Sequence, residues 1–150
     1  MQTFGDMLDG SLKSAPAFQF LLYPWVDMSG ESDSIQRFGK GLILTQETMT
    51  FFHGAYLPTD LEPQAIKTSP LLCEDMSRTP DTLMVTTEYD VLRDEGLAFV
   101  EKLQQAQVSV THLHLPDCTH GFISTGKFSP ATRKRLNEVA DILTQYAEAS

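Results

Sequence analysis

The chain has 150 residues, which is enough for one domain with a hydrophobic core. Hydrophobic residues make up 41% of the sequence and charged residues 21%, which is typical of a globular protein and excludes a disordered tail. The 20 acidic residues outnumber the 11 basic ones and give a net charge of −9. This charge argues against a nucleic acid or an anionic membrane as partner, because both require a basic surface.

Targeting signals and cysteine usage point to the cytoplasm. No window approaches the roughly 18 apolar residues of a membrane span, and the first ten residues lack the basic and apolar regions of a signal peptide. Two cysteines, Cys73 and Cys118, do not form a disulfide framework. We therefore expect a cytoplasmic protein with two reduced thiols and no membrane span.

The first third of the chain predicts one strand and one helix. Residues 1–17 show no sustained period and form a divergent N-terminal segment. Residues 17–23 are a short apolar run closed by proline, which predicts a buried strand. Residues 27–41 are rich in Gly, Ser and Asp and predict a loop. Thr45 is expected to cap a helix that ends before Pro58.

The rest of the chain alternates strands and helices. Four prolines in residues 58–81 predict a connection with short helices. Strands are expected at residues 82–87, which are rich in β-branched side chains, and at 108–115, which alternate. Amphipathic helices are expected at residues 93–105 and 130–149, the second with Ser129 as N-cap, and a loop is expected at 116–126.

This order of elements predicts an α/β fold. Strands separated by helices favour parallel pairing, so we expect about three mainly parallel strands with flanking helices. So small a sheet leaves two edges that nothing in the sequence protects.

Asp90 and His120 are the candidate catalytic residues. Each follows a predicted strand closely, and loops at the carboxyl ends of parallel strands meet at one rim of the sheet. A carboxylate beside an imidazole fixes the tautomer of the ring and stabilises its protonated form. The alternatives are that Asp90 caps the next helix and that His120 is a turn residue. Asp94 and Glu95 are expected to be ordinary first-turn acids, with Arg93 paired to one of them.

Four strings carry a resemblance to a known family: YPWVD (23–27), SPLL (69–72), TTEYDVLRDEG (86–96) and HGF (120–122). They resemble the carboxyl-terminal half of the α/β-hydrolase esterases and lipases related to hormone-sensitive lipase, from about residue 18 through the last helix. The resemblance implies that Asp90 is the acid and His120 the base of a Ser-Asp-His triad. It departs mildly at Val91, where the family commonly has proline. It also implies a small acyl-ester substrate and neither metal nor organic cofactor.

The nucleophile of the family is missing from these 150 residues. The attacking serine lies in G-x-S-x-G and an H-G-G motif supplies the oxyanion donors, and neither motif occurs in the sequence. We therefore expect a partial α/β-hydrolase fold without its N-terminal half, in which residues 18–150 are the carboxyl-terminal portion and about 40–80 form a cap-like helical insert. Such a chain is expected to be inactive alone.

Weaker constellations remain open. His112, His114, Cys118 and His120 lie close in sequence, but their spacing matches no strong zinc signature. Cys118 and His120 could form a nucleophilic pair. The aromatic residues Phe51, Phe52 and Tyr56 could line an acyl pocket or pack in the core.

Two functions from different classes follow. The first is a carboxylic ester hydrolase fragment that awaits a complementing N-terminal half. The alternative is a non-catalytic interaction module that pairs through exposed sheet edges, for which a homodimer through residues 108–115 is plausible on the family resemblance.

Overall fold

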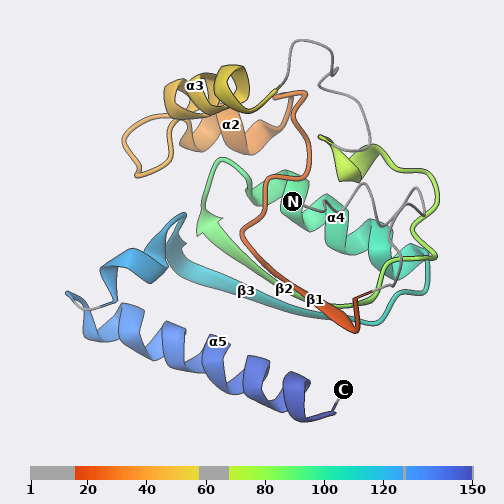
Figure 1. The fold of residues 1–150 in the computed structure, drawn as a ribbon. Helices are drawn as coiled ribbons and strands as arrows, with labels where there is room; N and C mark the ends of the chain where they lie inside the picture. Colours follow the sequence, from red (N-terminus) through yellow and green to blue (C-terminus); the bar gives the residue numbers. More distant parts are fainter. Residues whose placement is uncertain (1–15, 58–67, 127, 150) are drawn as a thin grey trace.

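A computed structural model describes residues 16–57, 68–126 and 128–149 (Figure 1). The predicted divergent segment 1–17 therefore lies almost wholly outside the described residues, as does much of the proline-rich connection. Its described part, residues 68–80, contains the 3-10 turn η1 (Pro70–Leu72).

A parallel three-stranded sheet organises the fold, as the element order predicts. Its strands are β1 (Phe18–Leu22), β2 (Asp81–Tyr89) and β3 (Val110–Thr119), in the spatial order β1-β2-β3. β2 lies in the centre, and its residues 82–87 are all buried. A strand covered on both faces is expected to be a continuous run of apolar and β-branched residues, and TLMVTT is such a run.

Helices cover both faces of the sheet (Figure 1). α4 (Arg93–Gln105) packs on one face, where Met84 contacts Phe99, and α5 (Pro130–Ala149) packs on the other, where Val85 and Val139 share a cluster. Neighbouring residues of β2 thus supply the two separate cores because side chains alternate along a strand.

The expected loop at residues 27–41 is wrong in part, because it contains α2 (Asp33–Phe38). Six residues are too few to show a helical period in the sequence. α2 is held by Ile35, which is 5% exposed, and by the Ser34 hydroxyl, which donates to the carbonyl of Val91 at 2.7 Å.

The helix after Thr45 is confirmed as α3 (Gln46–Tyr56), and the Thr45 hydroxyl accepts from the amide of Thr48 at 3.1 Å. In Figure 1, α2 and α3 lie beside each other beyond the carboxyl end of β2.

The expected loop at residues 116–126 is also wrong in part. β3 continues through Pro116 to Thr119, and a 3-10 turn, η2 (Phe122–Thr125), follows. Proline cannot donate to a ladder, but β3 has no partner on its outer side among the described strands, so the missing donor is tolerated there.

Ser129 caps α5 as predicted, since its hydroxyl accepts from the amide of Thr132 at 3.3 Å. We expect Ser129→Ala to lower the free energy of unfolding by about 1 kcal/mol, because one amide of the first turn loses its acceptor. Urea denaturation of the two proteins measures this difference. The exposed hydroxyl of Thr144 offers the control Thr144→Ala, for which a loss of equal size would contradict the capping role.

No helix in the described ranges is both long and apolar enough to cross a bilayer.

Candidate active site

Asp90 and His120 meet at the carboxyl rim of the sheet. Asp90 follows the last residue of β2 and His120 follows the last residue of β3. His120 Nδ1 lies 2.9 Å from Asp90 Oδ2. The Asp90 side chain is 1% exposed and that of His120 is 23% exposed, so the carboxylate is shielded from water while the ring reaches the surface. The sequence-based pairing of these two residues is present in the fold.

Further hydrogen bonds fix the Asp90 carboxylate. The amide of Leu92 donates to Oδ1 at 2.9 Å, and the hydroxyl of Thr87 donates to Oδ2 at 3.1 Å. The helix-capping alternative is wrong, because the N-cap of α4 is Leu92 and no side chain caps this helix. Asp90 instead closes the turn that precedes α4 and binds His120 at the same time. Each oxygen has a donor that orients it, so the carboxylate presents Oδ2 to the imidazole in a fixed direction.

Tyr23 supports the imidazole from the end of β1. Tyr23 begins the YPWVD string, but the sequence analysis assigned it no role in the site. Its ring centroid lies 4.3 Å from that of His120 and 5.9 Å from that of Phe122. Burial, together with the charge of Asp90, raises the pKa of Tyr23, so its phenol stays neutral. Its backbone φ of +38° is unusual for a residue with a side chain, a feature found at functional sites.

The backbone conformation of Gly121 explains why the His-Gly-Phe string has a glycine in its middle position. Its φ is +73°, a left-handed conformation that a residue with a Cβ rarely adopts. The chain reverses there directly after His120 and enters η2, which buries Phe122 beneath Tyr23. This turn directs the imidazole back toward Asp90.

A charged network flanks the turn after β2. Arg93 binds Asp94 at 2.8 Å, as expected, and also Glu88 at 2.7 Å. Glu88 in turn contacts His114 Nε2 at 3.2 Å. These bonds join the two ends of the turn that carries Asp90.

Glu95 departs from the expectation of an ordinary first-turn acid. It is 4% exposed, and its Oε1 accepts from the backbone amides of Val26 at 2.7 Å and Asp27 at 3.0 Å. The sequence places Glu95 in the first turn of a helix, but it does not show that a loop 68 or 69 residues away covers this turn.

The weaker constellations separate in space. His112 Nε2 and His114 Nδ1 both bond to the hydroxyl of Thr86, at 2.8 and 2.9 Å, whereas His120 binds Asp90. In the described parts of the chain, no three His, Cys, Asp or Glu side chains gather in a way that could hold a metal ion. Burial raises the pKa of Cys118 to about 11, so it remains a thiol at neutral pH and is a poor nucleophile.

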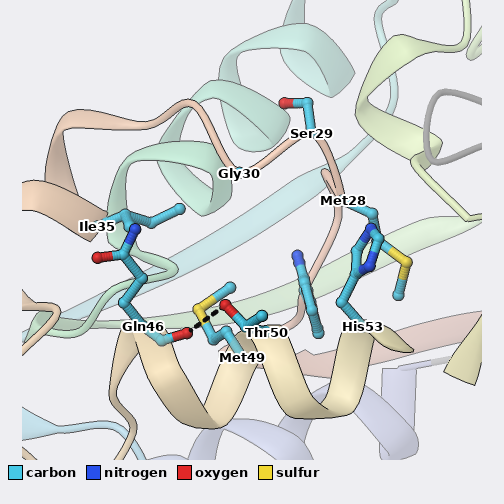
Figure 2. Close-up of a pocket in the computed structure, with 9 residues that line it drawn as sticks. Met28, Ser29, Gly30, Ile35, Gln46, Met49, Thr50 and His53 are labelled. Atoms are coloured by element: carbon cyan, nitrogen blue, oxygen red, sulfur yellow. Dashed lines mark hydrogen bonds between the residues drawn. The ribbon is translucent and has the colours of Figure 1, made fainter. Parts of the chain in front are cut away.

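A pocket of about 210 Å³ lies between the segment after β1 and helices α2 and α3 (Figure 2). Figure 2 shows Ile35 on one side and Met49, Thr50 and His53 along α3. Trp25, two residues after Tyr23 in the chain, also lines it. Its mixed lining suits an apolar group that carries one or two polar atoms.

The aromatic cluster of α3 does not line this pocket and is not core. Phe51 is 70% exposed, Phe52 is 51% exposed and Tyr56 is 58% exposed. The expectation that these residues pack in the core is therefore wrong. Their role in an acyl pocket stays a prediction. Met49 and His53 of the same helix line the pocket instead.

An acid–imidazole pair at the carboxyl rim of a parallel sheet is the arrangement of α/β hydrolases, and comparisons with known proteins agree. The family model of the alpha/beta hydrolase fold matches residues 6–124. The carboxylic ester hydrolase LipN of Mycobacterium tuberculosis is 33% identical over 132 residues, which are 87% of this chain and 35% of LipN. The ethyl acetate hydrolase of Pseudomonas putida is 31% identical over 155 residues, 95% of this chain and 49% of that protein.

Solved structures give the same result. The ester hydrolase EH1AB1 from the metagenome of Lake Arreo superposes with a TM-score of 0.85 at 35% identity, over 93% of this chain and 44% of that one. The chain belongs to the α/β-hydrolase family, in the esterase and lipase group that resembles hormone-sensitive lipase. It spans between a third and a half of the length of these two curated relatives.

Proposed function

We propose that this chain is the carboxyl-terminal part of a serine carboxylic ester hydrolase, in which Asp90 is the acid and His120 the base of a Ser-Asp-His triad. The observation that carries the proposal is the 2.9 Å contact between the buried Asp90 carboxylate and His120 Nδ1 at the rim of the sheet. The named ester hydrolases among its relatives support an ester as substrate.

In this proposal each atom of the pair has a task. With Nδ1 directed at Asp90, Nε2 is the nitrogen that can take a proton from an attacking serine hydroxyl. The serine oxygen adds to the ester carbonyl, and the proton passes through Nε2 to the departing alcohol. Water then attacks the acyl-enzyme, gives its proton to Nε2, and releases the acid and the serine. Asp90 stabilises the imidazolium in both halves of the reaction.

In this proposal a complementing N-terminal half contributes the serine and the oxyanion donors. The motifs that carry them in the family, G-x-S-x-G and H-G-G, do not occur in the 150 residues. β1 has no partner on its outer side among the described strands, so a further parallel strand can pair there. The carboxyl end of such a strand would reach the rim where Tyr23 contacts His120. A nucleophile turn at that place, contributed by a complementing N-terminal half, would complete the triad.

In this proposal the residues from about 40 to 80 form a cap-like insert, and the pocket of Figure 2 takes an apolar part of the small acyl ester. The reaction needs no metal and no organic cofactor. The buried, free Cys73 and Cys118 are compatible with a reducing compartment, and we place the protein in the cytoplasm.

Reconstitution tests the proposal. We expect the purified chain to show no turnover of p-nitrophenyl acetate, and we expect turnover when it is co-expressed with an N-terminal half from a related esterase that carries G-x-S-x-G. His120→Ala should abolish this turnover, whereas His112→Ala, in a different network, should retain it. Turnover by the chain alone that survives His120→Ala would refute the assignment.

The two free sheet edges support the alternative of a non-catalytic interaction module. β1 and β3 each lack a partner on one side among the described residues. Size-exclusion chromatography distinguishes the two functions in combination with the assay. A stable homodimer that shows no ester turnover with any complementing N-terminal half favours the interaction module.

A further inference from the structure

Glu95 has contacts that the triad does not explain. It lies in the first turn of α4, five residues after Asp90, and it is almost fully buried. Acids in this position usually face water and interact with the amino end of their own helix. Asp94 is an ordinary example, paired with the adjacent Arg93. The Glu95 carboxyl group instead crosses to another part of the fold.

Its partner is the segment of residues 23–28 that follows β1, which we call the β1 bend. Oε1 of Glu95 accepts from two successive amides of the bend, those of Val26 and Asp27. One oxygen that binds two neighbouring amides fixes both the position and the direction of that backbone. The carbonyl of Val26 is held in turn by the amide of Leu71 at 2.9 Å.

The other end of the bend contacts the base. The amide of Tyr23 continues the ladder by donating to the carbonyl of Val85 at 2.8 Å, and the Tyr23 ring packs against His120. Tyr23 holds an uncommon backbone conformation, which persists only where its surroundings enforce it. Only two residues separate Tyr23 from Val26, so a shift at the Glu95 contact reaches the ring beside the imidazole.

The charge state of Glu95 suits this task. Burial raises the pKa of Glu95 to about 8, the charges of Asp27 and Asp90 add to the rise, and the two amide hydrogen bonds oppose it. The group is therefore mainly neutral at pH 7, with a carbonyl oxygen that still accepts from both amides. A neutral Glu95 places no second negative charge beside Asp90.

We propose that Glu95 is a positioning residue of the site, which holds the β1 bend against the first turn of α4 and thereby sets Tyr23 against His120. The inference rests on the proposed function for its catalytic meaning. The structural link itself can be tested on the chain alone.

The test uses the ring signals of His120 and Tyr23 in NMR spectra of the chain, which has four histidines. Glu95→Gln keeps a carbonyl oxygen in place, whereas Glu95→Met fills a similar volume without an acceptor. We expect Glu95→Met to shift the signals of His120 and Tyr23 and to leave His112 and His114 in place. Glu95→Gln at pH 7 should retain the signals of His120, Tyr23, His112 and His114. The control Asp94→Asn, whose Arg93–Glu88 network reaches His114, should retain those of His120 and Tyr23.

The two variants also separate positioning from general stability. The folded chain keeps the Glu95 proton up to about pH 8, while the unfolded chain loses it near 4.5, so the melting temperature should fall across this window. Glu95→Gln should remove that part of the fall. In the reconstituted esterase, Glu95→Met should lower kcat several-fold with KM unchanged.

The proposal is overturned if Glu95→Met leaves His120 in place, if it moves every histidine alike, or if Glu95→Gln displaces His120 as far as Glu95→Met does. Should Glu95→Met fail to fold, the smaller change Glu95→Ala replaces it with the same expected shift of the His120 signals, and unshifted His120 signals in that variant overturn the proposal. A reconstituted enzyme without turnover counts against the proposed function alone, because the NMR result does not depend on activity.

Discussion

Asp90→Asn is expected to lower the turnover of the reconstituted esterase about 10,000-fold, the loss seen when the acid of such a triad becomes an amide. Asp90 accepts from Leu92, Thr87 and His120. Asparagine keeps one oxygen, and that oxygen can still serve the Leu92 amide. Its NH₂ group then stands where Oδ2 accepts from Thr87 and His120, and it can only donate.

The His120 imidazole then adopts the other tautomer, in which Nδ1 is unprotonated and accepts from the asparagine NH₂ group. The proton then sits on Nε2, the nitrogen that should receive the serine proton, so the base is blocked while the fold remains intact. We expect kcat to fall with little change in KM. Nitrogen chemical shifts of His120 in the isolated chain should report the exchange of tautomer directly.

Asp94→Asn is the matched control, because Asp94 lies close to Asp90 in the chain and its side chain pairs with Arg93. We expect this variant to keep at least half of the wild-type turnover and the His120 tautomer. If the two variants lose activity equally, Asp90 acts through the stability of the turn and is not the acid of the triad.

The sheet could be predicted because its signals are local. A run such as TLMVTT needs no knowledge of its neighbours to predict a buried strand, and the strand–helix alternation then fixes parallel pairing. α2 and the end of β3 could not be predicted. α2 is too short to show a period, and Pro116 indicates a break unless one knows that the strand lies at an edge.

The site could be predicted only where a residue follows a strand. The rule that loops meet at the carboxyl rim brings Asp90 and His120 together before any coordinates are known. Tyr23 also follows a strand, but the expected strand at residues 17–23 included it. Glu95 escapes the rule, because its role depends on how the β1 bend crosses the first turn of α4. The α3 aromatics show the converse failure. Their hydrophobic character predicted burial, but the sequence does not record that the described fold leaves these three rings exposed.

Phe99→Ala is expected to lower the free energy of unfolding by about 3–5 kcal/mol, since the variant leaves a large cavity under the sheet. Phe99 is fully buried in the cluster of α4 with Met84 and Leu103. A domain of this size is stable by only about 5–15 kcal/mol, so the variant should unfold at a much lower urea concentration.

Phe51→Ala makes the same chemical change on α3, where the ring is 70% exposed, and we expect it to alter stability by less than about 1 kcal/mol. Comparison of Phe99→Ala with Phe51→Ala therefore isolates the effect of burial on the free energy of unfolding, because both variants remove the same side chain. A large loss for Phe51→Ala would show that the aromatic side of α3 is covered in solution, and similar small losses for both variants would contradict the core formed by α4 and the sheet. Equilibrium urea denaturation at one pH gives both values, and a matching slope in urea confirms that the same structure unfolds in each.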